Sequence, residues 1–397
     1  MAARGRVNGG TISVSEMKKY LMKVAVVILN WNTKGFLERF LPGVLASAGC
    51  AQDGTPGGDY TVVVADNGST DGSAELMKER FPGATLLALD RNYGFTGGYN
   101  KAVTMLEDKG FDGILLLNSD IEVPQGWLEP LATFMEANPD CGICAPKLHA
   151  LQDKERFEYA GAAGGFIDRY GFPFCRGRVL KWTERDNGQF GDAPADVFWA
   201  TGACILVRTS LWKALGGLDD RFFAHMEEID FCWRARLEGW RVCVVPESVV
   251  YHLGGGTLSP DSPGKLKLNY RNNLLMLRNN LAKTLAIKYL HKGKSIGKAA
   301  SKAKGRAARR MFTRMVLDGI SAAIFLLTGR LSSYKAVVAA HREYRILRTP
   351  AASAQELEAF LTGHPNIGIT GIYSRCLPIS ALVFGKKTFG ALQPKIK

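Results

Sequence analysis

Short runs of consecutive apolar, β-branched residues alternate along the first part of the chain with stretches that have helical spacing. The first run, from Val24 to Leu29, reads VAVVIL and is typical of a parallel strand that is buried on both faces. Further predicted elements are strands at 60–65, 85–89 and 113–117, helices at 34–48, 73–80 and 99–109, and a glycine-rich turn at 92–98. This alternation predicts a right-handed, doubly wound, mostly parallel α/β sheet.

The pattern is less regular after residue 120. Residues 140–199 are rich in glycine and aromatic side chains, so we expect loops and short strands that shape a pocket. Strands are then predicted at 203–207 and 241–245, and helices at 210–215 and 227–238. Residues 257–397 are predicted to form a basic, helical region.

Small polar residues follow three of the predicted strands. Asn30 to Asn32 come after the first strand, Asp66 to Ser69 after the second, and Asn118 to Asp120 after the fourth. At any single strand end these residue types are ordinary turn formers. In a doubly wound sheet, however, ligands bind beyond the carboxyl ends of the strands, so three such ends together favour a binding site.

Positive charge is concentrated after the predicted sheet. The 397-residue chain has a formal net charge of +14, which indicates an anionic partner. Between Ser262 and Leu317 there are fifteen Lys and Arg residues and no Asp or Glu, with apolar residues among them. Basic amphipathic helices on an anionic membrane surface have this pattern. A solvated helical face that packs on a catalytic domain would have it too, and both interpretations stay open.

The eight cysteines are scattered and lie mostly in apolar stretches, which predicts buried free thiols and a reducing compartment. Cys141 and Cys144 have the spacing of a redox or zinc pair, but no second pair completes four ligands. No run reaches the roughly 18 apolar residues of a membrane span, and the N-terminal residues lack the apolar core of a secretion signal. We therefore expect a cytoplasmic protein, peripheral on the inner face of the cell membrane.

Several motifs occur in a characteristic order. They are VAVVILNWN, VVVADNGSTDGS, NYGFTGGYN, LLLNSD, GACILVRTSLW, GLDDRFFAHMEEIDFCWRARLEGW and VYHLGGGT. In this order they resemble family 2 glycosyltransferases of the GT-A fold, and more narrowly the rhamnosyltransferase-like branch. The resemblance implies an N-terminal extension at 1–22, a catalytic domain at 23–256 with a donor half at 23–120 and an acceptor half at 121–256, and the basic region at 257–397.

The resemblance also implies a divalent metal, Mn²⁺ or Mg²⁺, that holds the donor's diphosphate. Asp120, in Asn118-Ser119-Asp120, stands where such enzymes carry their D-x-D-like motif and is expected to bind the ion. Asn118 departs from the pattern, because it supplies an amide oxygen in place of a second carboxylate and would bind less tightly. His252 matches the position of an imidazole ligand in related enzymes.

The catalytic base is expected in Glu227-Glu228-Ile229-Asp230, which resembles the acidic motif of the family. Glu228 occupies the position of the base. Glu227 and Asp230 share a helix face, so one of them could bind acceptor hydroxyls while charge crowding raises a neighbour's pKa. Three acids in the first turn of a helix also favour the helix dipole without any catalytic role.

The remaining expected contacts are with the sugar nucleotide. Arg234 or Arg236 is expected to face the diphosphate. The predicted donor-binding residues are Asn30, Asn32, Asp66, Asn67, Asn92, Gly94, Gly97, Asn118 and Asp120.

The expected function is inverting transfer of a sugar, such as rhamnose, from a dTDP- or UDP-linked donor to a glycan or a lipid-linked acceptor. A dehydrogenase would need G-x-G-x-x-G after the first strand, where this chain has Asn30-Trp31-Asn32. Nucleic-acid binding is not expected, because the basic stretch lies outside the motifs and lacks an aromatic-rich RNA-binding signature. A glycosyltransferase-fold scaffold without activity remains an alternative, which the intact set of Asp120, Glu228 and His252 disfavours.

Overall fold

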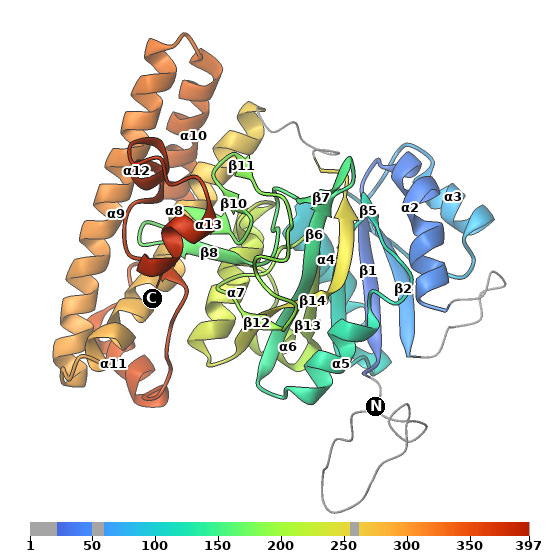
Figure 1. The fold of residues 1–397 in the computed structure, drawn as a ribbon, viewed down its shortest axis with the longest axis horizontal. Helices are drawn as coiled ribbons and strands as arrows, with labels where there is room; N and C mark the ends of the chain where they lie inside the picture. Colours follow the sequence, from blue (N-terminus) through green and yellow to red (C-terminus); the bar gives the residue numbers. More distant parts are fainter. Residues whose placement is uncertain (1–21, 50–58, 255–261, 397) are drawn as a thin grey trace, which may run out of the picture.

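A twisted sheet with helices on both faces is followed by a block of long helices (Figure 1). The computed structural model describes residues 22–49, 59–254 and 262–396. All but the last residue of the predicted N-terminal extension, and Cys50 as well, lie outside the described residues. The fold class is the one predicted from the sequence: an α/β, doubly wound, mostly parallel sheet with a basic helical C-terminal region.

The main sheet contains strands from both predicted halves of the catalytic domain. Along its width the strand order is β12-β14-β6-β13-β4-β1-β2-β3, with β5 paired to β14 and β7 to β6. The strands are β1 (Val24–Asn30), β2 (Tyr60–Asp66), β3 (Thr85–Ala88), β4 (Gly113–Asn118), β5 (Ile121–Glu122), β6 (Cys141–Ala150), β7 (Asp153–Phe157), β12 (Ala195–Asp196), β13 (Cys204–Arg208) and β14 (Arg241–His252).

The register of the central strands brings the polar strand ends level with one another. β1 lies between β2 and β4 and is parallel to both, and Asn30 pairs with Asp66 while Leu29 pairs with Asn118. β13 is antiparallel to β4 and to β6, so it begins where β4 ends. The three polar strand ends predicted from the sequence therefore meet at one edge of the sheet.

Buried side chains alternate between the two faces of β1, as in a strand that is covered on both sides. Val24, Val26 and Ile28 belong to one core cluster, and Ala25 and Val27 to the other. The first cluster lies under α2 (Lys34–Ser47), α3 (Ser73–Arg80) and α5 (Glu129–Ala137), and the second under α4 (Gly94–Thr104), α6 (Thr209–Leu215) and α7 (Glu227–Leu237).

Two elements extend further than the sequence predicted. The turn expected at 92–98 is wrong from Gly94 onward, because α4 begins there and the amide groups of Phe95 and Thr96 donate to the carbonyl of Phe223. Small residues allow this close packing, since a side chain at Gly98 would lie 2.7 Å from a methyl group of Leu29.

Strand β14 was expected to end at Val245, but it continues to His252 across a bulge. Val245 pairs with Pro146, and the next paired residue on β14 is Val249, which pairs with Lys147, so residues 246–248 have no partner on β6. Before the bulge Val244 faces the core under α4, whereas after it Val250 faces the opposite core. The bulge therefore turns the last part of the strand over.

A small second sheet joins residues 165–183 to the C-terminal part of the chain (Figure 1). Its strand order is β11-β10-β9-β8-β15, where β15 (Ile372–Tyr373) runs parallel to β8 (Gly165–Asp168). The other strands are β9 (Pro173–Cys175), β10 (Arg178–Val179) and β11 (Trp182–Thr183). The loops and short strands predicted for residues 140–199 are confirmed, while the contribution of residues near 372 was not predicted.

The basic region folds into helices, of which α8 packs against the sheet domain and α9 and α10 form a hairpin (Figure 1). Trp233 of α7 donates its indole N–H to Thr284 of α8 at 2.7 Å. Within the described ranges, none of the helices combines the length and the apolar content that a membrane span requires. The helices are α8 (Pro263–Leu290), α9 (Ile296–Leu327), α10 (Leu331–Leu347), α11 (Ala354–Gly363), α12 (Leu377–Leu382) and α13 (Phe389–Leu392).

Candidate active site

A buried hydrogen-bonded cluster occupies the ends of β1 and β2. The side-chain amide of Asn30 donates to Asp66 Oδ1 at 2.9 Å and to Ser69 Oγ at 3.1 Å, and its Oδ1 accepts a 2.6 Å bond from Thr33. Asp66 Oδ2 accepts from the backbone N–H of Ser69 at 3.0 Å. These bonds hold the two loops together and leave little of Asn30 free for a ligand.

Two further predicted donor residues line the same edge. Asn32 has a left-handed backbone (φ 52°), and its Oδ1 accepts the N–H of Thr70 at 2.7 Å. Asn67 donates to Asn92 Oδ1 at 3.1 Å and to the carbonyl of Gly94 at 3.0 Å, which ties β2 to the start of α4. The structure thus brings these residues together, while their contact with a nucleotide remains a prediction.

Gly94 and Gly97, which the sequence analysis assigned to donor binding, pack closely against neighbouring side chains. A Cβ at Gly94, which has φ +72°, would lie 2.5 Å from the ring of Phe223, and one at Gly97 would lie 3.0 Å from Tyr93 Cβ. Neighbouring side chains therefore account for both glycines. Their approach to a nucleotide stays a prediction.

Asp120 and His252 form a buried pair at the same edge. His252 pairs with Ile121 across β14 and β5, so the residue next to Ile121 lies beside the imidazole. His252 Nε2 is 3.1 Å from Asp120 Oδ1, and His252 Nδ1 is 3.4 Å from Glu158 Oε2. Burial alone would lower the pKa of His252, but its contacts with Asp120 and Glu158 raise the pKa to about 10.

This geometry fits a divalent ion held by two protein side chains. Asp120 would supply a carboxylate oxygen and His252 an imidazole nitrogen, and these two atoms lie 3.1 Å apart. In the part of the chain that the structure describes, no three His, Cys, Asp or Glu side chains converge on one metal position. The remaining positions around an ion would fall to a diphosphate and water, as is usual for ions that bind with nucleotides.

Glu158 is a member of this cluster that the sequence did not point to. Its carboxylate faces the second nitrogen of His252 and also accepts the backbone N–H of Ala160. A carboxylate in this position orients a histidine so that the other ring nitrogen can bind a metal. Asn118, the third predicted ligand, has a half-buried side chain, and its backbone N–H donates to the carbonyl of Ala203.

Glu227 and Glu228 lie at the start of α7 and keep unpaired carboxylate oxygens. Within the described residues, Oε2 of each is buried and has no hydrogen-bond partner. Burial raises the pKa of Glu228 to about 7. Burial and the charge of Glu228 raise the pKa of Glu227 well above its usual range. Both groups are thus carboxyls with raised proton affinity, as a general base that acts near neutral pH requires.

Packing places Glu228 near the metal pair. A Cβ at Gly202, just before β13, would lie 3.4 Å from Glu228 Cβ. A Cβ at Gly161 would lie 2.5 Å from Thr201 Cβ, so the segment that follows Glu158 packs against the segment beside Glu228. Burial raises the pKa of the Cys175 thiol, and the charges of Glu158 and Glu228 both raise it further, so both carboxylates lie near this thiol. The base candidate and the metal candidates therefore border one region at the end of β4.

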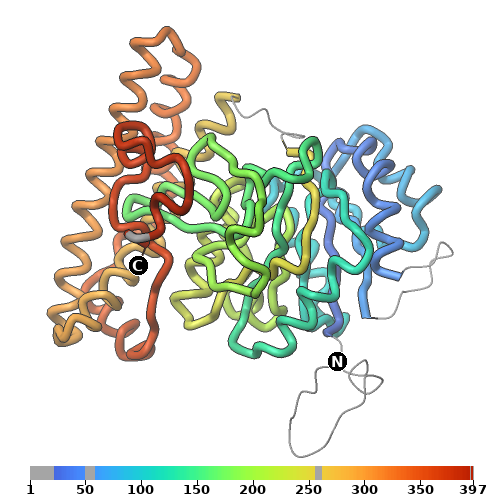
Figure 2. Tube along the Cα trace, viewed as in Figure 1, coloured from blue at the N-terminus to red at the C-terminus, as the bar shows by residue number. Residues whose placement is uncertain are grey.

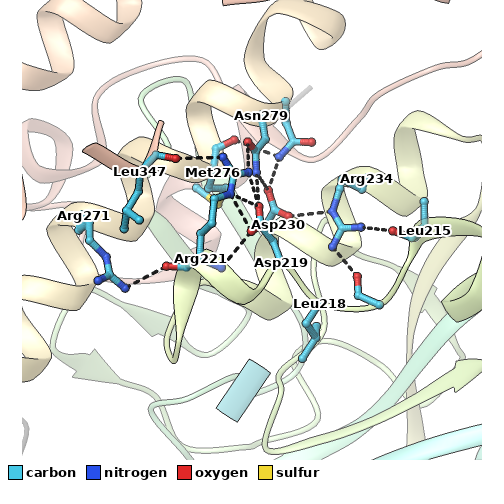
Figure 3. A network of polar contacts seen from close by, with 12 residues as sticks. Leu215, Leu218, Asp219, Arg221, Asp230, Arg234, Arg271, Met276, Asn279 and Leu347 are labelled. Atoms are coloured by element: carbon cyan, nitrogen blue, oxygen red, sulfur yellow. Dashed lines mark hydrogen bonds and ion pairs between the residues drawn. The ribbon is translucent and has the colours of Figure 1, made fainter. Parts of the chain in front are cut away.

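Asp230 is separated from the other two acids by the turn of α7. It is fully buried, and its Oδ2 accepts from Arg234 Nε at 2.8 Å while its Oδ1 accepts from Asn279 at 3.0 Å and from Asn280 at 2.7 Å (Figure 3). The same network includes Asp219, which is paired with Arg221 and bonded to Asn279. The structure does not bring Asp230 together with Glu228. Its bonds join α7 to α8.

Arg234 and Arg236 are also used inside the protein. Arg234 donates to the carbonyls of Leu215 and Gly217 besides Asp230. Arg236 donates to the carbonyl of Val197 and to Thr370. The structure therefore gives no support to the expectation that one of these guanidiniums faces a diphosphate.

The cysteines behave as core residues. The seven cysteines in the described ranges are all free, and Cys141 and Cys144 are buried in strand β6. Burial raises the pKa of Cys144 well above its usual range, which disfavours the thiolate that metal binding or redox chemistry needs. Both observations agree with the prediction of structural thiols.

Comparison with known proteins shows similarity to glycosyltransferases. Residues 25–190 match the model of the family described as "Glycosyl transferase family 2". The "N-acetylglucosaminyl-diphospho-decaprenol L-rhamnosyltransferase" of Mycobacterium tuberculosis is 27% identical over 267 residues, which cover 64% of this chain and 83% of the relative. The "dTDP-rhamnosyl transferase RfbF" of Shigella flexneri is 22% identical and covers 55% of this chain and 71% of its own.

A solved structure is also similar to this chain. The mannosyltransferase PcManGT from Pyrobaculum calidifontis, in complex with GDP-Man and Mn²⁺, has 14% sequence identity and a TM-score of 0.45 over 82% of this chain and 88% of its own.

A doubly wound sheet with acidic and polar side chains at its carboxyl edge, together with the family match, defines this protein as a glycosyltransferase. The match to family 2 covers residues 25–190, and the chain is similar to two rhamnosyltransferases.

Proposed function

We propose that this glycosyltransferase is metal-dependent and inverting, and that it transfers rhamnose from a dTDP-linked donor to a hydroxyl of a lipid-linked glycan. UDP-linked donors are the second candidate. The observation that carries the proposal is the 3.1 Å pair of Asp120 and His252 at the carboxyl edge of the sheet, with unpaired Glu228 in the same region. The names of the two rhamnosyltransferase relatives support the sugar, and the name of the mycobacterial relative supports the acceptor class.

In this mechanism Asp120 and His252 would hold the ion, and Glu158 would orient His252. A bound Mn²⁺ or Mg²⁺ supplies Lewis-acid stabilisation of the charge that grows on the leaving diphosphate. Glu228 accepts the proton of the acceptor hydroxyl as its oxygen attacks the anomeric carbon. The bond from this carbon to the diphosphate oxygen breaks on the opposite side, so the configuration inverts and the nucleoside diphosphate leaves.

The raised pKa of Glu228 suits this role. A base with a pKa of about 7 is partly ionised at neutral pH and binds a proton more strongly than an ordinary glutamate. Glu227 lies beside it and is 4% exposed, and burial together with the charge of Glu228 raises the pKa of Glu227 well above its usual range. The partners of this proposed reaction are a sugar nucleotide, a divalent ion, a lipid-linked glycan and an anionic membrane surface.

Calorimetric titration with dTDP and UDP, with and without Mn²⁺, tests the donor site. We expect one nucleotide to bind in the presence of Mn²⁺ and to bind weakly without it or in Asp120→Asn. The matched control is Glu122→Gln, two residues away, where an exposed carboxylate pairs with Lys154 at the surface. If folded protein bound neither nucleotide under any metal condition, the inactive-scaffold alternative would replace the proposal.

The stereochemistry needs a separate measurement. NMR of the product from dTDP-rhamnose, whose rhamnose has a defined anomeric configuration, should show the opposite configuration at the new bond. Retention of configuration would contradict the role given to Glu228, even if the nucleotide site is correct.

A further inference from the structure

The outward face of α9 carries an uninterrupted apolar stripe. Its exposed large apolar residues follow one another at intervals of three or four residues, so they share a face of the helix. They are Phe312, Val316, Ile320, Ile324 and Leu327, with exposed fractions of 66%, 45%, 52%, 54% and 86%. Monomeric soluble proteins rarely leave so many large apolar side chains together in water, and such stripes mark interaction surfaces.

The opposite face of α9 is the one that packs on the protein. The buried residues Ala303, Met311, Arg314, Asp318 and Ala322 lie about half a turn away from the stripe. Arg314 and Asp318 pair with each other there at 2.8 Å. The stripe is therefore not an extension of the core.

Cations continue the same face toward the start of α9. Lys298, Lys302 and Arg309 are exposed and fall in line with the stripe at helical spacing. The one acidic residue of α9 is Asp318, which is 1% exposed and lies on the inner face. We call the stripe and these three cations the α9 outer surface. It is apolar in its second half, cationic in its first half, and has no carboxylate of its own.

The apolar half is the half nearest the active-site edge. α8 begins at the end of the molecule where β14 ends with His252, α9 returns in the opposite direction, and the turn between α9 and α10 projects toward the side of the strand ends (Figures 1 and 2). Leu331 at the start of α10 is 49% exposed and Arg330 precedes it, so the tip of the hairpin repeats the pairing of apolar and cationic residues.

We propose that the α9 outer surface docks on an anionic lipid bilayer, with its apolar half among the acyl chains and its cations at the phosphate level. Charge complementarity selects this occupant, since an apolar stripe continued by cations and free of carboxylates matches a leaflet with negative headgroups. The inference rests on the proposed lipid-linked acceptor for its purpose: the docked helix would hold the enzyme on the leaflet that contains that acceptor.

Cosedimentation of the full chain with vesicles tests this surface. We expect binding to vesicles of equal parts phosphatidylcholine and phosphatidylglycerol, and weaker binding to phosphatidylcholine alone. Ile320→Glu combined with Ile324→Glu should lower the partition coefficient by at least about tenfold, because apolar groups leave the acyl region. Lys302→Ala combined with Arg309→Ala should lower it about fivefold for each cation on the anionic vesicles only.

Met105→Glu is the matched control. Met105 is 49% exposed and lies at the end of α4, so the substitution introduces one charge of the same sign at an exposed apolar position away from α9. We expect this variant to bind vesicles like the unmodified chain. Thermal unfolding of all variants should be unchanged, since every substituted side chain is at the surface.

Nucleotide binding separates this inference from the proposed function. Asp120→Asn should lose the Mn²⁺-dependent nucleotide binding and keep vesicle binding, and the α9 variants should do the reverse. The inference is overturned if the unmodified chain ignores anionic vesicles, or if Ile320→Glu with Ile324→Glu binds them as well as Met105→Glu does. It is also overturned if light scattering shows a dimer that the α9 variants convert to monomers, because the occupant would then be a second copy of the chain.

Discussion

Replacing Asp230 with alanine should destabilise the protein without touching its nucleotide site. Asp230 is fully buried and accepts three bonds, from Arg234, Asn279 and Asn280. Its removal takes one acceptor from a guanidinium and from two amide groups, although Asn279 keeps its bond to Asp219 and Asn280 its bond to the carbonyl of Met276. Breaking a buried ion pair by removing one partner costs about 3–5 kcal/mol. We expect about 3 kcal/mol, since Arg234 keeps two carbonyl partners and its side chain is 21% exposed.

Urea unfolding followed by tryptophan fluorescence measures this free energy. The control is Glu38→Ala, which removes one partner of a 3.2 Å surface pair with Arg80 and should cost less than about 1 kcal/mol. Nucleotide binding by Asp230→Ala, measured where the variant is folded, should match that of the unmodified chain. If the free energy of unfolding of Asp230→Ala fell within about 1 kcal/mol of the original, the network in Figure 3 would not be what holds α7 on α8.

Four predictions concern the chemistry of the site. Glu228→Gln should lower kcat by about 10²–10⁴-fold while nucleotide affinity is kept, and equal activity in the variant would exclude Glu228 as the base. Because the pKa of Glu228 is raised to about 7 and the base must be ionised, kcat/KM should rise with pH up to about 7 in the unmodified chain, and Glu228→Gln should lack this rise. The raised pKa also affects stability, because the folded state binds the proton of Glu228 more tightly than the unfolded state, in which the pKa is near 4.5. The contribution of Glu228 to the free energy of unfolding should therefore fall as the pH rises from about 4.5 through about 7. Glu158→Gln should raise the Mn²⁺ concentration needed for half-maximal nucleotide binding by about 10–100-fold, measured by calorimetry, and an unchanged Mn²⁺ requirement would show that Glu158 does not support His252.

The fold of residues 23–120 could be predicted from the sequence, because the strands there are continuous apolar runs between helices with clear polar boundaries. Helix α3 was predicted to the residue, and the strand ends at Asn30 and Asp66 were predicted to meet. The start of α4 was missed because its glycines read as a turn. Contacts with Phe223, far along the chain, make them helical, and no local pattern reports such contacts.

For the candidate site, the sequence predicted residue types, and the structure shows which of these residues lie together. The resemblance of the motifs led to Asp120 and His252, and the structure places them 3.1 Å apart. Glu158 was missed because a single carboxylate before a glycine-rich segment has no distinctive spacing. Asp230 was grouped with Glu228 because the sequence shows three acids in one turn. It cannot show that asparagines of α8 meet the other side of that helix.

The contact between His252 and Asp120 depends on whether the bulge in β14 contains an odd or an even number of unpaired residues. Side chains alternate between the faces of a strand, and residues 246–248 reverse this alternation before the chain reaches His252. Deleting one residue there would restore the other parity and turn His252 away from Asp120, although every side chain of the site would still be present in the sequence. A comparison of homologous chains that checks only for the histidine would therefore miss a chain in which the histidine is turned away from the aspartate. A comparison that also counts the residues of the bulge would find such a chain.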